Sequence, residues 1–345
     1  MELSQDFIHS LPKTDLHIHL DGSLRPETVV DIAKKKNISL PTFDIEELRS
    51  FLTVDGEVDN LPKYLEKFDI TCSVMQDYES LKRTAFELAE DNAKQNVRYV
   101  EVRYSPILHQ NEGMKLEPIV DAVLDGLHEA ERHYDIRTGV IICGIRSIDP
   151  DTSLRLAELT VKYKRKGVVA FDLAGAEYNY PAKDHVRAFY LVRNNNINAT
   201  LHAGEAFGPE SIHQAIHYCG AHRIGHGTRL IEDEDLLEYV RDHRIPLEMC
   251  LTSNVQTKTV ESLEAHPFKH YLDKNMRVTL CTDNTLVSGV NITDELLLAV
   301  RTFDLTYPQL AKTILNGFKS VFLPFDEKVE IYQKAKADLL KHVKF

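Results

Sequence analysis

Short apolar runs recur along the chain, and each is followed by an amphipathic stretch rich in lysine and glutamate. Eight such runs occupy residues 14–18, 97–104, 136–145, 168–174, 199–203, 223–226, 246–251 and 277–282. Continuous apolar runs, unlike alternating ones, are typical of strands that are buried on both faces of a parallel sheet. The pattern therefore predicts eight buried parallel strands.

The stretches between these runs predict helices, with 116–133, 151–166 and 232–243 as the clearest examples. The last of them begins with four acidic residues, which the helix dipole favours in a first turn. Strands that alternate with helices predict βαβ units, and eight units close naturally into a barrel. An open doubly wound sheet has the same alternation, but no G-x-G-x-x-G turn follows the first run. We therefore expect an α/β protein with a (β/α)₈ TIM barrel.

Two segments extend this repeat. Residues 25–95 are too many for one connecting helix and predict several extra helices after the first strand. Residues 307–318 and 324–343 predict a helical C-terminal tail that packs across the barrel. Because no linker or low-complexity tract marks a boundary, we expect residues 1–345 to form a single domain.

Charge and composition narrow the choice of partner and location. The formal net charge of −12 disfavours a nucleic-acid partner, because phosphate backbones are bound chiefly by Lys and Arg, and favours a small-molecule substrate. No stretch approaches the ~18 apolar residues of a membrane span, and the N-terminus lacks the features of a secretory signal. The five cysteines are odd in number and form no C-x-x-C motif. We expect a cytoplasmic protein that does not associate with membranes.

Polar side chains follow the apolar part of several predicted strands. The first run leads into His17-Ile18-His19, and side chains two residues apart on a strand point to the same face. The fifth run ends near His202, the sixth contains His226, and the eighth is followed by Asp283. Active sites of TIM barrels form at the C-terminal ends of the strands, so we expect these side chains to converge.

Three histidines and one carboxylate make a zinc site that leaves room for a bound water. We therefore predict one Zn²⁺ per chain with His17, His19, His202 and Asp283 as its ligands. His226 could supply a fifth nitrogen, but we favour a role beside the metal-bound water.

Glu205 is a candidate proton donor because it lies three residues after His202. A carboxyl group that is tucked beside a metal and under a lid can have a raised pKa, which suits proton donation. Covalent serine catalysis has no support, because Ser153, Ser211 and similar serines lack a nucleophile-elbow sequence.

Taken in order, several segments carry a resemblance to a known family. The segments TDLHIHLDGSLRPET, VEVRYSP, FDLAGAE, HAGE, RIGHGT, the SN of CLTSN and CTDN resemble the adenosine deaminase family, and they run from residue 14 to about 288. The resemblance implies a (β/α)₈ barrel with one zinc. It also implies a hydrolase of purine metabolism that replaces the 6-amino group of a purine nucleoside with oxygen and releases ammonia.

The resemblance implies the same four metal ligands and assigns catalytic roles. Glu205 would protonate purine N1 as water attacks C6, and His226 would orient and stabilise the attacking hydroxide. Asp283 could also accept the proton of that water. Protonation of N1 draws electrons away from C6, which is a coherent reason for this arrangement.

The resemblance also implies substrate contacts. Gly175 would present its backbone N–H to purine N3, and His19 and Asp21 would face the ribose. Adenine deaminases tend to have Glu where this chain has Asp21, which favours a nucleoside over a free base. Asn284 departs from animal-type members, which have Asp at the position that meets N7, and an Asn amide can donate there at any pH.

We therefore expect deamination of adenosine or 2′-deoxyadenosine. The alternatives are a 5′-modified adenosine such as aminodeoxyfutalosine, free adenine, or a barrel that binds purines without catalysis. A binuclear amidohydrolase is disfavoured because residues 172–175 lack the lysine that would bridge two metals. A cytidine-type deaminase is disfavoured because its H-x-E and P-C-x-x-C motifs do not occur in this chain.

Overall fold

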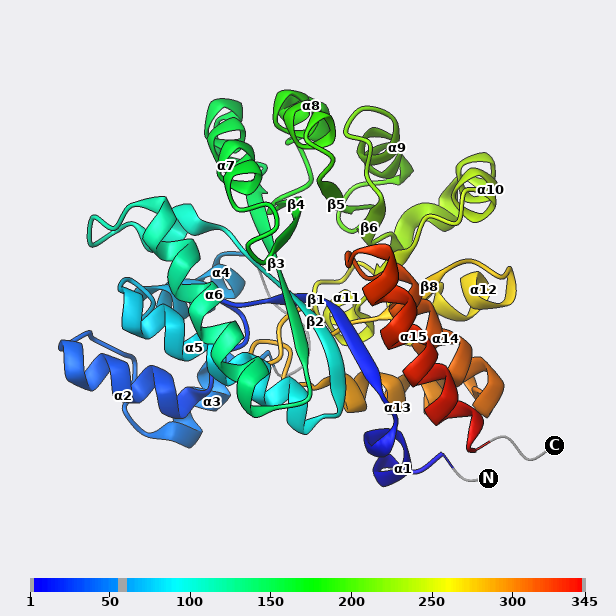
Figure 1. Ribbon diagram of the computed structural model, residues 1–345, viewed down its shortest axis with the longest axis horizontal. Helices are drawn as coiled ribbons and strands as arrows, with labels where there is room; N and C mark the ends of the chain where they lie inside the picture. Colours follow the sequence, from blue (N-terminus) through cyan, green and yellow to red (C-terminus); the bar gives the residue numbers. More distant parts are fainter. Residues whose placement is uncertain (1–2, 55–60, 343–345) are drawn as a thin grey trace.

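The computed structural model describes residues 3–54 and 61–342, and it contains one eight-stranded parallel sheet (Figure 1). The strands follow one another in chain order around the sheet. They are β1 (Lys13–His19), β2 (Val97–Tyr104), β3 (Arg137–Ile145), β4 (Val168–Ala174), β5 (Asn198–Ala203), β6 (Arg223–His226), β7 (Leu247–Met249) and β8 (Val278–Leu280). Each corresponds to one predicted apolar run.

The sheet closes into a barrel between β1 and the loop that follows β8. The backbone N–H of His19 donates to the carbonyl of Asp283 at 2.7 Å, and the N–H of Asp283 donates to the carbonyl of His17 at 2.8 Å. Ile18 and Asp283 accordingly form a parallel bridge. The predicted TIM barrel is confirmed. The residues whose backbones form the closing hydrogen bonds, His17, His19 and Asp283, are also three of the predicted metal ligands.

Helices connect the strands on the outside of the barrel (Figure 1). They are α5 (Tyr78–Lys94), α6 (Leu116–His133), α7 (Pro150–Lys162), α8 (Val186–Asn194), α9 (Pro209–His217), α10 (Glu234–Asp242), α11 (Leu251–Gln256), α12 (Phe268–Asp273) and α13 (Ile292–Phe303), with short 3₁₀ turns at Pro106–His109, Ala182–His185 and Thr228–Glu232.

Helix α6 has the predicted bounds, whereas several other predicted boundaries were wrong, and three of them have a clear local reason. Helix α7 ends four residues before the predicted end, because Arg165 and Gly167 turn the chain through positive φ. Helix α10 starts two residues late, because the Asp233 side chain caps it by accepting from Leu236 N–H. Strand β7 is shorter than its apolar run because α11 already begins at Leu251.

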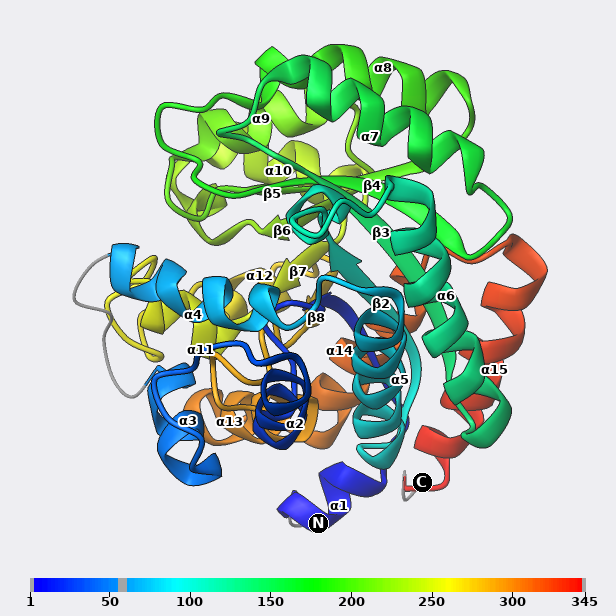
Figure 2. The same cartoon turned by 90° about the vertical axis from the view of Figure 1, so that its left-hand side faces the viewer.

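The segment between β1 and α5 forms several helices, as predicted. They are α2 (Pro26–Lys36), α3 (Ile45–Leu52) and α4 (Leu61–Ser73). Figure 2 shows them on the side of the barrel where α11 and α13 lie. The end of α3 is tied to the loop after β8, because Val54 N–H donates to the carbonyl of Val287 at 2.7 Å. This insertion therefore packs beside the C-terminal ends of the strands.

The predicted C-terminal tail helices are α14 (Tyr307–Ser320) and α15 (Phe325–Leu340), and α1 (Gln5–Ser10) precedes β1. Helix α14 packs against β1 and β8. The connection to α15 reaches the strands as well: the Phe322 ring lies 3.6 Å from the Arg223 guanidinium, and Phe322 N–H donates to Glu101 at 2.7 Å. In the described part of the chain, every helix is too short or too polar to cross a lipid bilayer.

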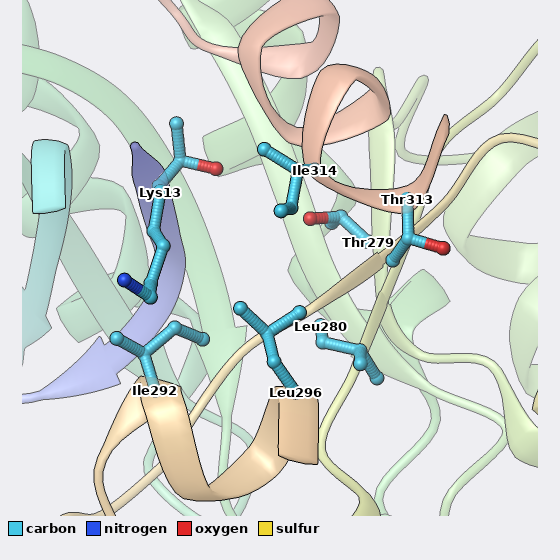
Figure 3. A pocket seen from close by; sticks show the side chains of 8 residues that line it. Lys13, Thr279, Leu280, Ile292, Leu296, Thr313 and Ile314 are labelled. Atoms are coloured by element: carbon cyan, nitrogen blue, oxygen red, sulfur yellow. The ribbon is translucent and has the colours of Figure 1, made fainter. Parts of the chain in front are cut away.

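A cavity of about 10 Å³ lies where α13 and α14 meet β8 and the start of β1 (Figure 3). Its lining includes Lys13, Thr14 and Thr279, and the volume suits about one water molecule. Helix α14 approaches closely here because residue 317 is glycine. A Cβ atom at Gly317 would overlap Oγ1 of Thr14 and lie 3.0 Å from Oγ1 of Thr279.

We expect the substitution Gly317→Ala to lower the free energy of unfolding by about 1–3 kcal/mol, because the new methyl group overpacks this contact. Urea unfolding would measure the change. The double variant Gly317→Ala/Thr14→Ala should recover part of the loss, since it removes the clashing hydroxyl. An unchanged urea midpoint in the single variant would show that α14 can move away without cost.

Candidate metal and substrate site

Three histidine side chains and one carboxylate meet at the C-terminal ends of β1, β5 and β8. His17 Nε2 lies 3.0 Å from His202 Nε2, and His19 Nε2 lies 3.1 Å from the same atom. Asp283 Oδ1 lies 3.5 Å from His17 Nε2 and 3.4 Å from His19 Nε2. One candidate ligand atom from each of His17, His202, His226 and Asp283 also falls within 4.8 Å of the others. The structure therefore brings together the four predicted ligands and His226.

Two buried carboxylates orient the histidines. His17 Nδ1 lies 2.9 Å from Glu248 Oε2, and His202 Nδ1 lies 3.0 Å from Asp172 Oδ2. A carboxylate accepts hydrogen bonds, so each Nδ1 carries a proton and each Nε2 lone pair faces the cluster. Burial lowers the pKa of His17 to about 4, which keeps this imidazole neutral.

Lone pairs that face one another at 3.0 Å repel each other unless a cation lies between them. Burial would raise the pKa of Asp283, but the neighbouring His17 and His19 hold it well below its ordinary value. The carboxylate is therefore ionised and can serve as an anionic ligand. Imidazole nitrogens together with an ionised carboxylate suit a divalent metal ion such as zinc, so the residues present fit this group.

An ion-pair network below the cluster keeps the orienting carboxylates charged. Arg103 donates to Asp172 at 2.9 Å and to Glu248 at 2.7 Å, and all three side chains are fully buried. Arg223 donates to Glu248 at 2.5 Å and also pairs with Glu101. Burial alone would raise the pKa of Glu248, but the charges of Arg103 and Arg223 hold it well below its ordinary value. Glu248 therefore remains an acceptor for the imidazole.

Glu205 lies just beyond β5 and faces the cluster. Its Oε2 is 3.6 Å from His226 Nε2, and 23% of its side chain is exposed. Partial burial raises the pKa of Glu205, and the negative charge of Asp283 acts in the same direction. A carboxyl group that holds its proton more firmly than usual suits a proton donor.

The loop that carries Glu205 is held by Glu177, a residue to which the sequence analysis gave no role. The buried Glu177 carboxylate accepts the backbone N–H groups of Gly204 at 2.7 Å, Glu205 at 3.0 Å and Phe207 at 2.8 Å. Gly204 has a φ of +67°, and its carbonyl accepts from Thr228 Oγ1 at 2.7 Å. These contacts define the position of the Glu205 backbone.

The predicted substrate residues lie around the same rim. Asp21 and Asn284 are 7% and 3% exposed, and the Oδ1 atom of each is buried without a partner among the described residues. The Asn284 amide lies against Gly22, where any Cβ would overlap it. Gly175 follows β4, is exposed and has a φ of +91°. Unused hydrogen-bonding capacity in buried groups is expected where a ligand binds.

Two residues of the cluster have a backbone conformation that the sequence did not indicate. His226 and Asp283 both have a φ of +62°, the left-handed region that residues other than glycine rarely adopt. Asp283 is held there by its two hydrogen bonds to β1 and by Ser253 Oγ, which donates to Oδ2 at 2.7 Å.

The orienting roles of Asp172 and Glu248 were not predicted from the sequence either. One signal could have found them: each is a charged residue inside an apolar run, VVAFDLA and PLEMCL respectively. A carboxylate at such a position must have a buried partner. Glu177 ends the segment FDLAGAE, but nothing local to it indicates its partners, because all three come from a different loop.

Comparisons with known proteins agree with this geometry. The family model described as adenosine deaminase matches residues 12–337. An adenosine deaminase from Clostridium kluyveri is 40% identical over 324 residues, which are 94% of this chain and 93% of that protein. A probable adenosine deaminase from Dictyostelium discoideum is 40% identical over 99% of this chain, which spans only 44% of the length of that protein.

Among solved structures, an adenine deaminase from Arthrobacter aurescens superimposes with a TM-score of 0.88 at 25% identity, covering 95% of this chain and 99% of that chain. The matched family model spans every strand of the barrel and every residue of the histidine–aspartate cluster. The chain belongs to the adenosine deaminase family.

Proposed function

We propose that this chain hydrolyses adenosine or 2′-deoxyadenosine to inosine or 2′-deoxyinosine and ammonia. The observation that carries the proposal is the convergence of imidazole lone pairs and an ionised carboxylate beside Glu205, in a member of the adenosine deaminase family. The relative with comparable length and 40% identity is an adenosine deaminase, which supports the same substrate.

One zinc ion would be held by His17, His19, His202 and Asp283, with Glu248 and Asp172 orienting two of the imidazoles. When bound, the zinc would supply Lewis-acid chemistry that makes water a nucleophile near neutral pH.

The protein's own residues perform the proton transfers. Glu205, with its raised pKa, donates a proton to purine N1, which makes C6 more electrophilic as water adds to it. Asp283 accepts a proton of the attacking water, and His226 donates a hydrogen bond to the oxygen that adds at C6. The 6-amino group then takes up the proton held by Asp283 and leaves as ammonia, and the remaining hydroxyl proton on the added oxygen returns to Glu205 as the C6 carbonyl forms.

Substrate specificity would come from residues at or just after the ends of β1, β4 and β8, at the same rim of the barrel. His19 and Asp21 would contact the ribose, Gly175 N–H would donate to N3, and the Asn284 amide would donate to N7. Asp21 favours a nucleoside over free adenine, and the adenine deaminase compared above is less similar in sequence than the adenosine deaminase. A 5′-modified adenosine would keep all the base contacts and is the second candidate.

We also propose that residues 1–345 act as one domain in the cytoplasm. One hydrophobic cluster includes side chains from Ile8 to Leu339, which supports a single folding unit.

An ultraviolet assay across adenosine, 2′-deoxyadenosine, adenine and 5′-extended adenosines tests the substrate. We expect adenosine or 2′-deoxyadenosine to give the highest kcat/KM, a chelator to abolish activity, and added zinc to restore it. Preference for adenine or for a 5′-extended compound would replace the proposed substrate. Purine binding to the zinc-loaded protein without ammonia release would leave only a binding function.

We expect Glu205→Gln to lower kcat by roughly 10²–10⁴-fold with the metal content unchanged, because the amide cannot give a proton to N1. Steady-state kinetics with zinc analysis would measure this. Glu210→Gln is the matched control, since Glu210 is exposed on α9, and it should keep the wild-type rate. A near-normal rate in Glu205→Gln would rule out this residue as the proton donor.

A further inference from the structure

A series of hydrogen-bonded, buried side chains leads away from His226, and the reaction described above does not use it. Asn254 lies in α11 and has no exposed surface, while His266 is 3% exposed. Asn254 Nδ2 lies 3.0 Å from His226 Nδ1, and Asn254 Oδ1 lies 3.2 Å from His266 Nε2. The series of hydrogen bonds ends at the backbone N–H of Phe268, which is 3.1 Å from His266 Nδ1.

The direction of every hydrogen bond in this series follows from the last one, between the backbone N–H of Phe268 and His266 Nδ1. A backbone N–H can only donate, so His266 Nδ1 accepts and carries no proton. Burial lowers the pKa of His266 to about 3, so the ring is neutral and its single proton is on Nε2. That proton is donated to Asn254, which identifies the amide atom facing His266 as oxygen. The NH₂ group of Asn254 must therefore face His226.

Asn254 consequently donates to His226 Nδ1, so that nitrogen carries no proton and the ring N–H lies on Nε2. His17 and His202 show the opposite arrangement, because a carboxylate accepts from each Nδ1 and leaves Nε2 as a lone pair. A histidine whose Nε2 is protonated donates a hydrogen bond and cannot ligate a metal through that atom. His226 is close enough to the cluster to be counted among its possible ligands, but its hydrogen bonds distinguish it from them.

We propose that Asn254 and His266 are positioning residues that fix His226 as an Nε2–H donor, which excludes it from the metal and directs an N–H group at the reacting oxygen. The inference rests on the proposed deaminase function and deepens it. The sequence left two roles open for His226, a fifth metal ligand or a group beside the metal-bound water, and the hydrogen bonds favour the second. His226 Nε2 already faces a carboxyl group, that of Glu205, at 3.6 Å.

Two substitutions of Asn254 separate hydrogen-bond direction from packing. Asn254→Asp keeps the shape but replaces the donor with an acceptor, so it forces the His226 proton onto Nδ1. Asn254→Ala removes the hydrogen bond to Nδ1, so the His226 ring can adopt either tautomer. We expect Asn254→Asp to lower kcat by about 100-fold or more, as the wrong histidine tautomer does in serine proteases, with KM within about three-fold and metal content unchanged.

Asn254→Ala should lose less activity than Asn254→Asp, even though it leaves a cavity. A packing role for Asn254 predicts the reverse order, because the aspartate preserves the shape of the native side chain. Equal rates for the Asp variant and the wild type, or the reverse order, would overturn the proposal.

Long-range ¹H–¹⁵N NMR of histidine-labelled, metal-free protein reads the tautomer without any deamination. We expect an Nε2–H tautomer for His226, assigned by the signal that disappears in His226→Gln, and a change of that signal in Asn254→Asp. An Nδ1–H tautomer in the wild type would overturn the inference. Failure of the wild-type enzyme to deaminate any 6-aminopurine would instead count against the proposed function, so the two outcomes are distinguishable.

Discussion

The hydrogen bonds between the two edges of the sheet at Asp283 are the interaction on which the rest of the structure depends. Asp283 donates to His17 and accepts from His19 through its backbone, and its side chain lies within 3.5 Å of both imidazoles. The bonds that close the barrel therefore also bring the carboxylate to the histidines. Residues 264 or more positions apart in the sequence meet because a parallel sheet closes there, and not because of any local motif.

Closure alone would not give imidazoles with a defined orientation. The buried ion pairs of Arg103 and Arg223 with Asp172, Glu248 and Glu101 supply that orientation. Burying charged groups costs free energy that even good pairing barely offsets, so an apolar barrel interior would be at least as stable. The network is better explained by its effect on the site, because it keeps two carboxylates ionised and each of them aligns a histidine.

Much of this could be predicted from the sequence because the signals are periodic. The eight apolar runs each became a strand, and the polar residues that follow them converge because the ends of barrel strands form one rim. Helix α6 was predicted with its correct bounds, since its apolar face is continuous, whereas α7 ended early at a turn with positive φ that no pattern indicated. What could not be predicted depends on contacts between loops: Glu177 holds the loop of Glu205, and His266 meets Asn254 across an irregular segment.

The central claim is the proposal that one metal ion is held by His202 together with the residues that close the barrel. Anomalous diffraction at the zinc edge from crystals of the zinc-loaded protein tests it most directly. We predict a single strong peak within about 2.3 Å of donor atoms from His17, His19, His202 and Asp283, with His226 Nε2 outside coordinating distance. Two peaks, a peak elsewhere in the chain, or a bond from the metal to His226 in place of His19 would contradict this account.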